Sequence, residues 1–449
     1  MVSAAEQLAA NLNLKTFAKA EDLKKRIWFT LGALLIFRFG TYIPLPGIDV
    51  SVMGEIARQN AGGILGIFDK FSGGALGRMT IFALGIMPYI SSSIIVQLMT
   101  AVSPQLEALK KEGESGRRKL NQYTRYLTVI LAILQSYAIA VGLENMLSPT
   151  GVSAVFIPGL FFRFTTVVTL LGGTLFLMWL GEQITSRGIG NGTSLIIFSG
   201  IVANMPQAIA STLELGRTGA LSPFFILFIL MLSLGLIAFI VFMERAQRRI
   251  IIQYPKRQVG MRVFAGEATH LPIKLNSAGV IPPIFASSLL LLPATVVNLT
   301  ARSGGEGLLA TMAASLQPGN LVHILLSASL IIFFAFFYTA VVFNPTDTAE
   351  NLKKNGGFIA GYRPGQNTAD YLDYVLTRLT LVGALYMAAI CVLPEVLMTR
   401  YAIPFYLGVT SLLIVVGVSM DTVAQIQSHL LAHQYEGLLK RSKLLGRKR

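Results

Sequence analysis

Charged residues are scarce in this sequence. Asp, Glu, Lys and Arg make up 13% of its 449 residues, whereas hydrophobic residues make up 53%. A soluble domain carries about a quarter charged residues, so this chain has too few to cover a surface exposed to water. The single cysteine, Cys391, excludes an internal disulfide framework. The scarcity of charge predicts a chain that is dissolved in lipid.

Motifs for enzyme chemistry are also missing. The sequence holds no GxxxxGK[ST] phosphate loop and no HExxH pair, and His429 and His433 lack an acidic or cysteine companion. We therefore expect no catalytic residues, no metal and no cofactor. Arg38 is the one charge well inside a predicted span. We expect it to reach the membrane interface or a backbone carbonyl rather than a substrate.

Long apolar runs are abundant. About 20 residues are needed to cross the hydrocarbon core as a helix, and ten runs approach that length: 26–45, 79–102, 123–143, 160–182, 193–213, 222–243, 275–297, 321–343, 374–394 and 403–423. With the N-terminus inside, the inner segments hold 29 Lys and Arg and the outer segments hold 7. Because basic residues favour the cytoplasmic side, both termini are expected in the cytoplasm.

Two of these runs repeat one pattern. The sequence GIMPYISS at 85–92 resembles GVIPPIFASS at 279–288, and the two runs occupy corresponding places in two five-span halves. Glycine and proline at matching places in inverted halves point to a transport path, although small residues also serve ordinary helix packing. We expect each helix to be kinked at its proline. The serines beyond should either donate to freed carbonyls or form a polar seam between the helices.

The segment 62–77 is apolar, too short to span, and bounded by glycines. It is typical of either a re-entrant half-helix or an external surface helix, and composition alone favours the surface helix.

Several long motifs resemble the SecY family, whose members form the central subunit of the bacterial protein-conducting channel. They are IPLPGID at 43–49, FSGGALGRMTIFALGIMPYISSSI at 71–94, KEGESGRRKLNQYTRY at 111–126, MWLGEQITSRGIGNG at 178–192, GVIPPIFASS at 279–288, NPTDTAENLKKNGGFIAGYRPG at 344–365 and TSLLIVVGVSMD at 410–421. The resemblance covers roughly residues 20–440.

The resemblance implies an all-α integral membrane protein. Its ten transmembrane helices would form two inverted five-helix halves, a clamshell around an hourglass pore. The halves would be 26–215 and 216–423, between cytoplasmic tails at 1–25 and 424–449. Such a channel passes unfolded secretory polypeptides across the bacterial inner membrane and releases transmembrane segments sideways into lipid.

The resemblance also assigns residues to roles. The pore ring would contain Ile86, Ile90, Ile197, Ile284 and Ile414, with Thr193 where a further ring member is usual. The plug would be 62–77, with Ile64, Leu65, Ile67, Phe68 and Phe71, in place of the surface helix. The lateral gate would include Pro88, Ser91, Ser92, Pro282, Ser287 and Ser288.

The implied partners are SecE-like and SecG-like small membrane subunits, a SecA-like motor ATPase, the ribosome, signal sequences, the nascent polypeptide and membrane lipid. Docking would use the loops 244–274 and 344–373. Their candidate contacts are Arg245, Arg248, Arg249, Lys256, Arg257, Arg262 and Arg363, although Ala360 stands where a proline is usual. These charges would otherwise serve only to fix topology.

A secondary transporter of a small solute is the alternative, because it shares the inverted repeat. It would need a polar site at the membrane midplane, which the predicted spans do not offer.

Overall fold

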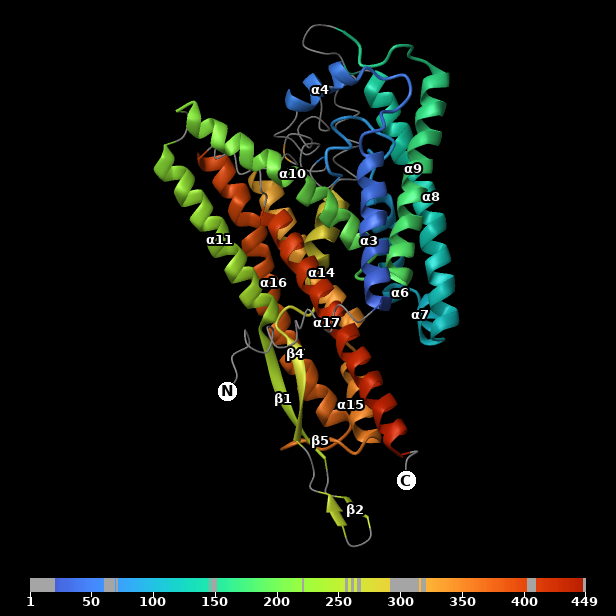
Figure 1. The fold of residues 1–449 in the computed structure, drawn as a ribbon, viewed down its shortest axis with the longest axis vertical. Coiled ribbons are helices and arrows are strands. Elements are labelled where there is room, and N and C mark those ends of the chain that lie inside the picture. The colour runs from blue at the N-terminus through green and yellow to red at the C-terminus, as the bar shows by residue number, and fades with distance from the viewer. Residues whose placement is uncertain are drawn as a thin grey trace. The chain divides into compact units, whose positions relative to one another are not determined.

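The computed structural model describes residues 21–59, 69, 72–144, 146, 152–219, 222–254, 257–259, 262–264, 268–290, 315, 320–401 and 409–446. These residues are mostly helical (Figure 1). They belong to two compact units. The first comprises Met1–Gln97, Ala108–Ile209 and Ile414–Arg449, and the second comprises Leu98–Glu107 and Ala210–Leu413.

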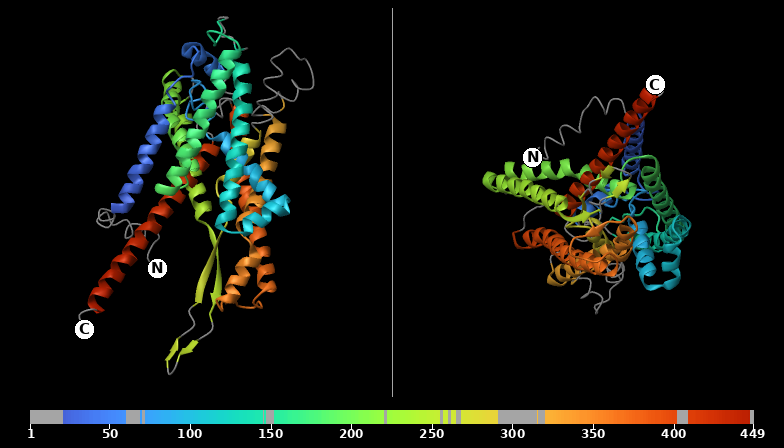
Figure 2. Two further views of the ribbon diagram at one scale, coloured as in Figure 1. Left: turned by 90° about the vertical axis from the view of Figure 1, so that its right-hand side faces the viewer. Right: turned by 90° about the horizontal axis from the view of Figure 1, so that it is seen from below.

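The first unit is built from helices that follow the predicted spans. They are α3 (Glu21–Gly40), α8 (Glu114–Glu144) and α9 (Leu160–Arg187), with most of α6 (Met87–Val102), α10 (Gly192–Arg217) and α17 (Val409–Gly446). The short helix α4 (Val50–Gln59) also belongs to this unit and lies between the first two predicted spans. The short helix α7 (Pro104–Lys111) joins α6 to α8. The helices α8 and α9 run side by side (Figure 2). A core that includes Leu143, Phe162 and Leu170 packs at one end of this pair.

The second unit holds α11 (Pro223–Arg245), a helix at Ile281–Leu290, α14 (Leu321–Val342), α15 (Pro345–Lys354) and α16 (Gln366–Tyr401). Local sequence explains where α11 and α15 begin. Ser222 and Asn344 accept hydrogen bonds from the first-turn amides of Phe225 and Thr346, and each cap is followed by a proline at the first helical position. Proline is favoured there because its missing N–H would have no partner in any case.

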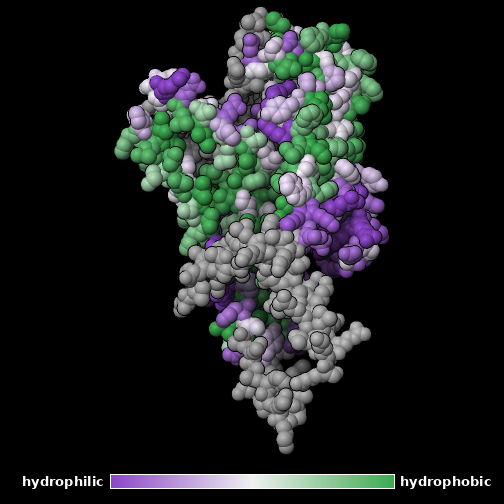
Figure 3. Space-filling view, in the orientation of Figure 1, coloured by the Kyte–Doolittle hydropathy of each residue, from purple (hydrophilic) through white to green (hydrophobic). Residues whose placement is uncertain are grey.

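Seven helices among the described residues are long and apolar enough to cross a membrane, and Met87–Val102 and Ile281–Leu290 are shorter apolar helices. The charged first residues of α3 account for its absence from the seven. In α11, Ile240 is the only buried residue, and large side chains such as Phe224 and Met231 are exposed. Apolar residues cover this helix (Figure 3). An apolar surface of this kind marks contact with a membrane or with another protein rather than with water.

The loop 244–274 contains strands that we did not predict. The strand β1 (Gln247–Gln253) pairs antiparallel with β4 (Ala268–Lys274) and, on its other edge, with the two-residue strand β5 (Phe358–Ile359). A second, small pair is formed by β2 (Arg257–Val259) and β3 (Arg262–Phe264). The signal for β1 was the run Ile250-Ile251-Ile252, because β-branched residues favour strands.

The predicted proline kinks are wrong. Residues 81–86 form turns, and α6 begins at Met87, so Pro88 is its second residue. The helix at Ile281–Leu290 begins one residue before Pro282. A proline in the first turn removes no helical hydrogen bond and bends nothing. The glycines ahead of these helices, Gly85 and Gly279, have φ of 55° and 62°, values that favour glycine.

Candidate channel elements

The two repeated segments have the same local structure. Each consists of a glycine with positive φ, a helix start that contains proline, and serines that bond back to the helix. Ser92 donates to the Pro88 carbonyl at 2.7 Å, and Ser287 donates to the Pro283 carbonyl at 2.8 Å. Ser288 donates to the Ile284 carbonyl at 2.8 Å. The serines do donate to carbonyls, but these carbonyls are not ones that the prolines free, because each proline lies in the first turn of its helix. A seam between the two helices stays a prediction.

Buried isoleucines occupy all five predicted ring positions. Ile86 and Ile90 are one turn apart at the start of α6, Ile197 is on α10 and Ile414 is on α17. Ile284 is on the helix of the second unit. A Cβ on Gly181 would lie 3.6 Å from Ile86 Cδ1 and 3.5 Å from Thr193 Cγ2. Thr193, where the resemblance expects a further ring member, and Ile86 therefore both approach Gly181. Ring membership itself stays a prediction.

Arg38 binds a backbone carbonyl, as predicted. Its Nη1 donates to the Gly73 carbonyl at 2.7 Å, and its Nη2 donates to Tyr42 Oη at 2.8 Å. Gly73 belongs to the segment 62–77, of which the structure describes residue 69 and residues 72–77. The predicted plug residues Ile64, Leu65, Ile67, Phe68 and Phe71 lie outside the described residues.

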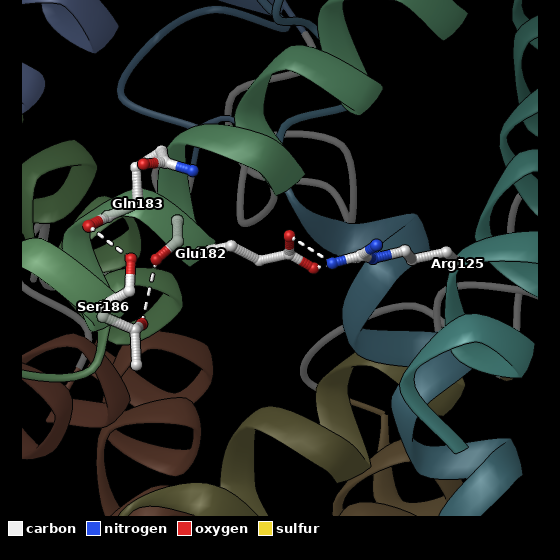
Figure 4. A network of polar contacts seen from close by, with 6 residues as sticks. Arg125, Glu182, Gln183 and Ser186 are labelled. Atoms are coloured by element: carbon white, nitrogen blue, oxygen red, sulfur yellow. Dashed lines mark hydrogen bonds and ion pairs between the residues drawn. The ribbon is translucent and has the colours of Figure 1, made fainter. Parts of the chain in front are cut away.

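Two ion pairs join α8 to α9, one toward each end of the pair. Arg125 donates to both Glu182 carboxylate oxygens, from Nε at 2.9 Å and from Nη2 at 2.7 Å (Figure 4). At the other end, Glu144 accepts from Arg163 Nε at 2.8 Å and from the Gly159 amide at 2.9 Å. The Arg125–Glu182 pair is bidentate, and a pair of this kind fixes geometry as well as adding energy. We did not predict either pair, because the partners are distant in sequence.

The two predicted docking loops belong to one structural module in the second unit. The pairing of β1 with β5 joins the loop 244–274 to the loop 344–373. Ile250, Ile273 and Ile359 from the strands pack with Leu372 and Leu376 of α16 beneath them. Because strand side chains alternate between faces, the core on one face leaves the other side of the strands in contact with water.

The structure describes the side chains of only some of the basic residues in this module. Arg245 at the end of α11 and Arg248 and Arg249 on β1 have exposed side chains. Lys256 lies outside the described residues, and Arg257 and Arg262 are described by their backbone pairing in β2 and β3.

Arg363 lies in an exposed turn directly before α16. Thr368 Oγ1 donates to the Arg363 carbonyl at 2.8 Å, and Tyr362 stacks on Tyr371 with their ring centroids 4.1 Å apart. Tyr362 N also donates to the Ile359 carbonyl at 3.1 Å. These contacts and the β5 pairing order the turn although residue 360 is alanine. The guanidinium is exposed beyond them.

Comparisons with known proteins agree with this arrangement. The SecY family model matches residues 80–423. Protein translocase subunit SecY of Rickettsia conorii is 56% identical over 423 residues, which is 94% of this chain and 97% of the relative. Its counterpart in Escherichia coli K12 is 56% identical over 425 residues, 95% of this chain and 96% of the relative.

Solved structures share the fold at lower identity. A protein-conducting channel matches with a TM-score of 0.64 and 15% identity, over 90% of this chain and 92% of that one. Sec61 in the canine ribosome-channel complex matches with a TM-score of 0.62 and 16% identity, over the same shares. None of these matches is to a small-solute transporter.

The apolar helices and these matches define a class: the chain is a multi-pass membrane protein with the fold of the protein-conducting channels, and the predicted fold class is confirmed. The chain belongs to the SecY family, and its function is that of a protein-conducting channel.

Proposed function

We propose that this channel passes unfolded secretory polypeptides across the bacterial inner membrane and opens sideways between span 2 and span 7. Both termini would lie in the cytoplasm, in accord with the charge asymmetry of the loops. The observation that carries the proposal is the matched start of α6 and of the helix at Ile281–Leu290. Each follows a glycine turn and has a serine hydroxyl that donates to a carbonyl of its own helix, and matched segments of this kind in two inverted halves support a path at the repeat interface.

A disulfide between these helices tests the lateral gate. We expect cysteines at Ser91 and Ser288, in a Cys391→Ser background, to crosslink and to block the release of transmembrane segments into lipid, because a covalent bond prevents separation. The measurement is insertion of a model membrane protein with and without reductant. The same chain with one of the two cysteines is the control. A crosslink that forms readily while client passage continues would rule out this gate.

The five isoleucines form the constriction in this proposal. An apolar neck resists ions by dewetting, and β-branched side chains hold their shape because χ1 is restricted. A pore for arbitrary polypeptide also needs a wall that binds no particular side chain. The burial of all five side chains supports the assignment.

Replacing one ring residue by asparagine, at Ile90 for example, is expected to hydrate the neck. Ion leak should rise and selectivity for signal sequences should loosen. The measurements are conductance in planar bilayers and export of a client with a defective signal sequence. Leu234→Asn on the exposed side of α11 is the matched control. If several ring variants left both ion leak and signal-sequence selectivity unchanged, the assignment of these isoleucines to the constriction would be wrong.

The energy for transport comes from outside the chain, which carries no phosphate loop. A docked ribosome or a SecA-like ATPase would supply this energy while bound to the module of β1, β4 and β5 and to Arg363. The solved Sec61 and Ssh1 channels bound to ribosomes support a ribosome partner. SecE-like and SecG-like subunits would complete the channel, and signal sequences, nascent chains and lipid would meet it at the gate.

A further inference from the structure

Two arginines meet at one backbone oxygen in the first unit. Arg38, in the last turn of α3, donates to the Gly73 carbonyl at 2.7 Å, and Arg78 Nη2 donates to the same oxygen at 3.0 Å. A carbonyl has two lone pairs and can accept both bonds. Tyr42 links the cations, since its hydroxyl accepts from Arg38 and its ring lies 4.2 Å below the Arg78 guanidinium. Cation–π contact of this kind favours a fixed guanidinium position.

Gly73 fits this place because it has no side chain. Its φ is +72°, and a Cβ would lie 3.0 Å from Gly200 Cα on α10 and 3.2 Å from Arg38 Nη1. The backbone at Gly73 is therefore held between α10 and the guanidinium of Arg38.

The turn around Gly73 is also ordered by its own residues. The Asp69 carboxylate accepts from the Gly77 amide at 2.6 Å, and the Asp69 carbonyl accepts from the Gly74 amide at 2.8 Å. The two donors differ in their distance from the Gly73 oxygen and in their place in the chain. Arg78 Nε is buried with no acceptor among the described residues, which costs Arg78 desolvation. Arg38 has the shorter bond to Gly73 and belongs to α3, whereas Arg78 follows the turn itself, so the Arg38 bond attaches this turn to span 1.

We propose that Arg38 is a positioning residue that fastens the downstream end of the segment 62–77 to span 1, with Arg78 as a second donor, and thereby sets how rarely the resting channel leaks. This rests on the proposed role of 62–77 as the plug. Charge-assisted bonds to a carbonyl are among the stronger hydrogen bonds in proteins. A plug that leaves its resting place would have to break the bond between Arg38 and the Gly73 carbonyl. That bond therefore favours the resting state.

The test is the ion conductance of the resting channel in planar bilayers, measured on the intact complex purified from the membrane. Arg38→Met keeps the chain length and removes the donors. It is expected to raise resting conductance by at least about tenfold, the factor that corresponds to one charged hydrogen bond. Arg38→Lys keeps one cationic donor and should give an intermediate value. Arg217→Met, which removes an exposed cation with only a 3.7 Å surface contact to Glu214, should leave conductance unchanged.

A double variant separates this role from general destabilisation. In a chain with residues 64–74 deleted, Gly73 is gone, so Arg38→Met should add no further leak. If the deletion variant leaks but Arg38→Met has wild-type conductance, the positioning role of Arg38 is wrong and the plug assignment stands. A deletion that does not leak would overturn the plug. Equal increments from Arg38→Met with and without the deletion would show that Arg38 acts elsewhere. If Arg38→Met does not accumulate in the membrane, the Arg38→Lys and Gly73→Ala variants decide by the same criteria.

Discussion

Replacing Arg363 by glutamate is expected to lower the initial rate of ATP-driven export by at least about tenfold, because the change removes charge-assisted contacts to a motor and adds repulsion from its carboxylates. Membrane insertion of the channel itself should be normal. The features that order the turn use the Arg363 backbone and its neighbours, through Thr368 Oγ1 and the Tyr362–Tyr371 stack, and none of them uses the guanidinium.

The measurement for Arg363→Glu is ATP-dependent translocation of a preprotein into vesicles that contain the channel and the motor. Lys354→Glu is the matched control, since it reverses an exposed charge in the same loop whose contact is a surface pair with Glu350 at 3.2 Å. Normal export by the Arg363→Glu channel would mean that the basic residue serves topology alone.

Deleting residues 64–74 is expected to give the largest change in resting ion leak. The deletion removes an apolar segment proposed to block the pore, and with it the Gly73 carbonyl that Arg38 and Arg78 bind. Leak should rise in planar bilayers before any client is added, while the transmembrane helices still insert. The isoleucine neck alone then has to exclude ions, and its dewetting should keep the leak below that of a hydrated Ile90→Asn neck in the same background.

Unchanged resting conductance after this deletion would contradict the plug assignment and return segment 62–77 to the external surface helix that its composition favours. The control is a deletion of similar length in the C-terminal tail at 436–446. Such a deletion shortens the chain at a site to which no pore role is assigned.

Much of the fold could be predicted because lipid imposes a simple rule on sequence. Each of the ten predicted spans contains a helix in the described residues, since about 20 apolar residues satisfy both the bilayer and the helix. The contact of Arg38 with a carbonyl also followed from the cost of an unpaired charge in a span. Its partner, Gly73, could not be named, because the approach depends on the turn that Asp69 stabilises.

The proline prediction failed for a physical reason. A proline in an apolar run was assumed to interrupt a continuous helix, whereas Gly85 and Gly279 end the preceding turn and allow the helix to begin at the proline. The signal was present in the glycine three residues before Pro88 and Pro282. The β1–β5 pairing and the Arg125–Glu182 pair were beyond prediction because their partners come together only through tertiary structure.

Site-specific photocrosslinking to a client halted in transit shows most directly whether a polypeptide passes through the isoleucine neck. Photoreactive residues placed singly at Ile86 and Ile284 should both form adducts with the halted client, and a probe at Met231 on the exposed side of α11 should form adducts with lipid instead. The ring adducts should disappear when the client is released by completing translocation. Passage through the isoleucine neck would be contradicted if the halted client crosslinked to neither isoleucine position while it still spanned the membrane.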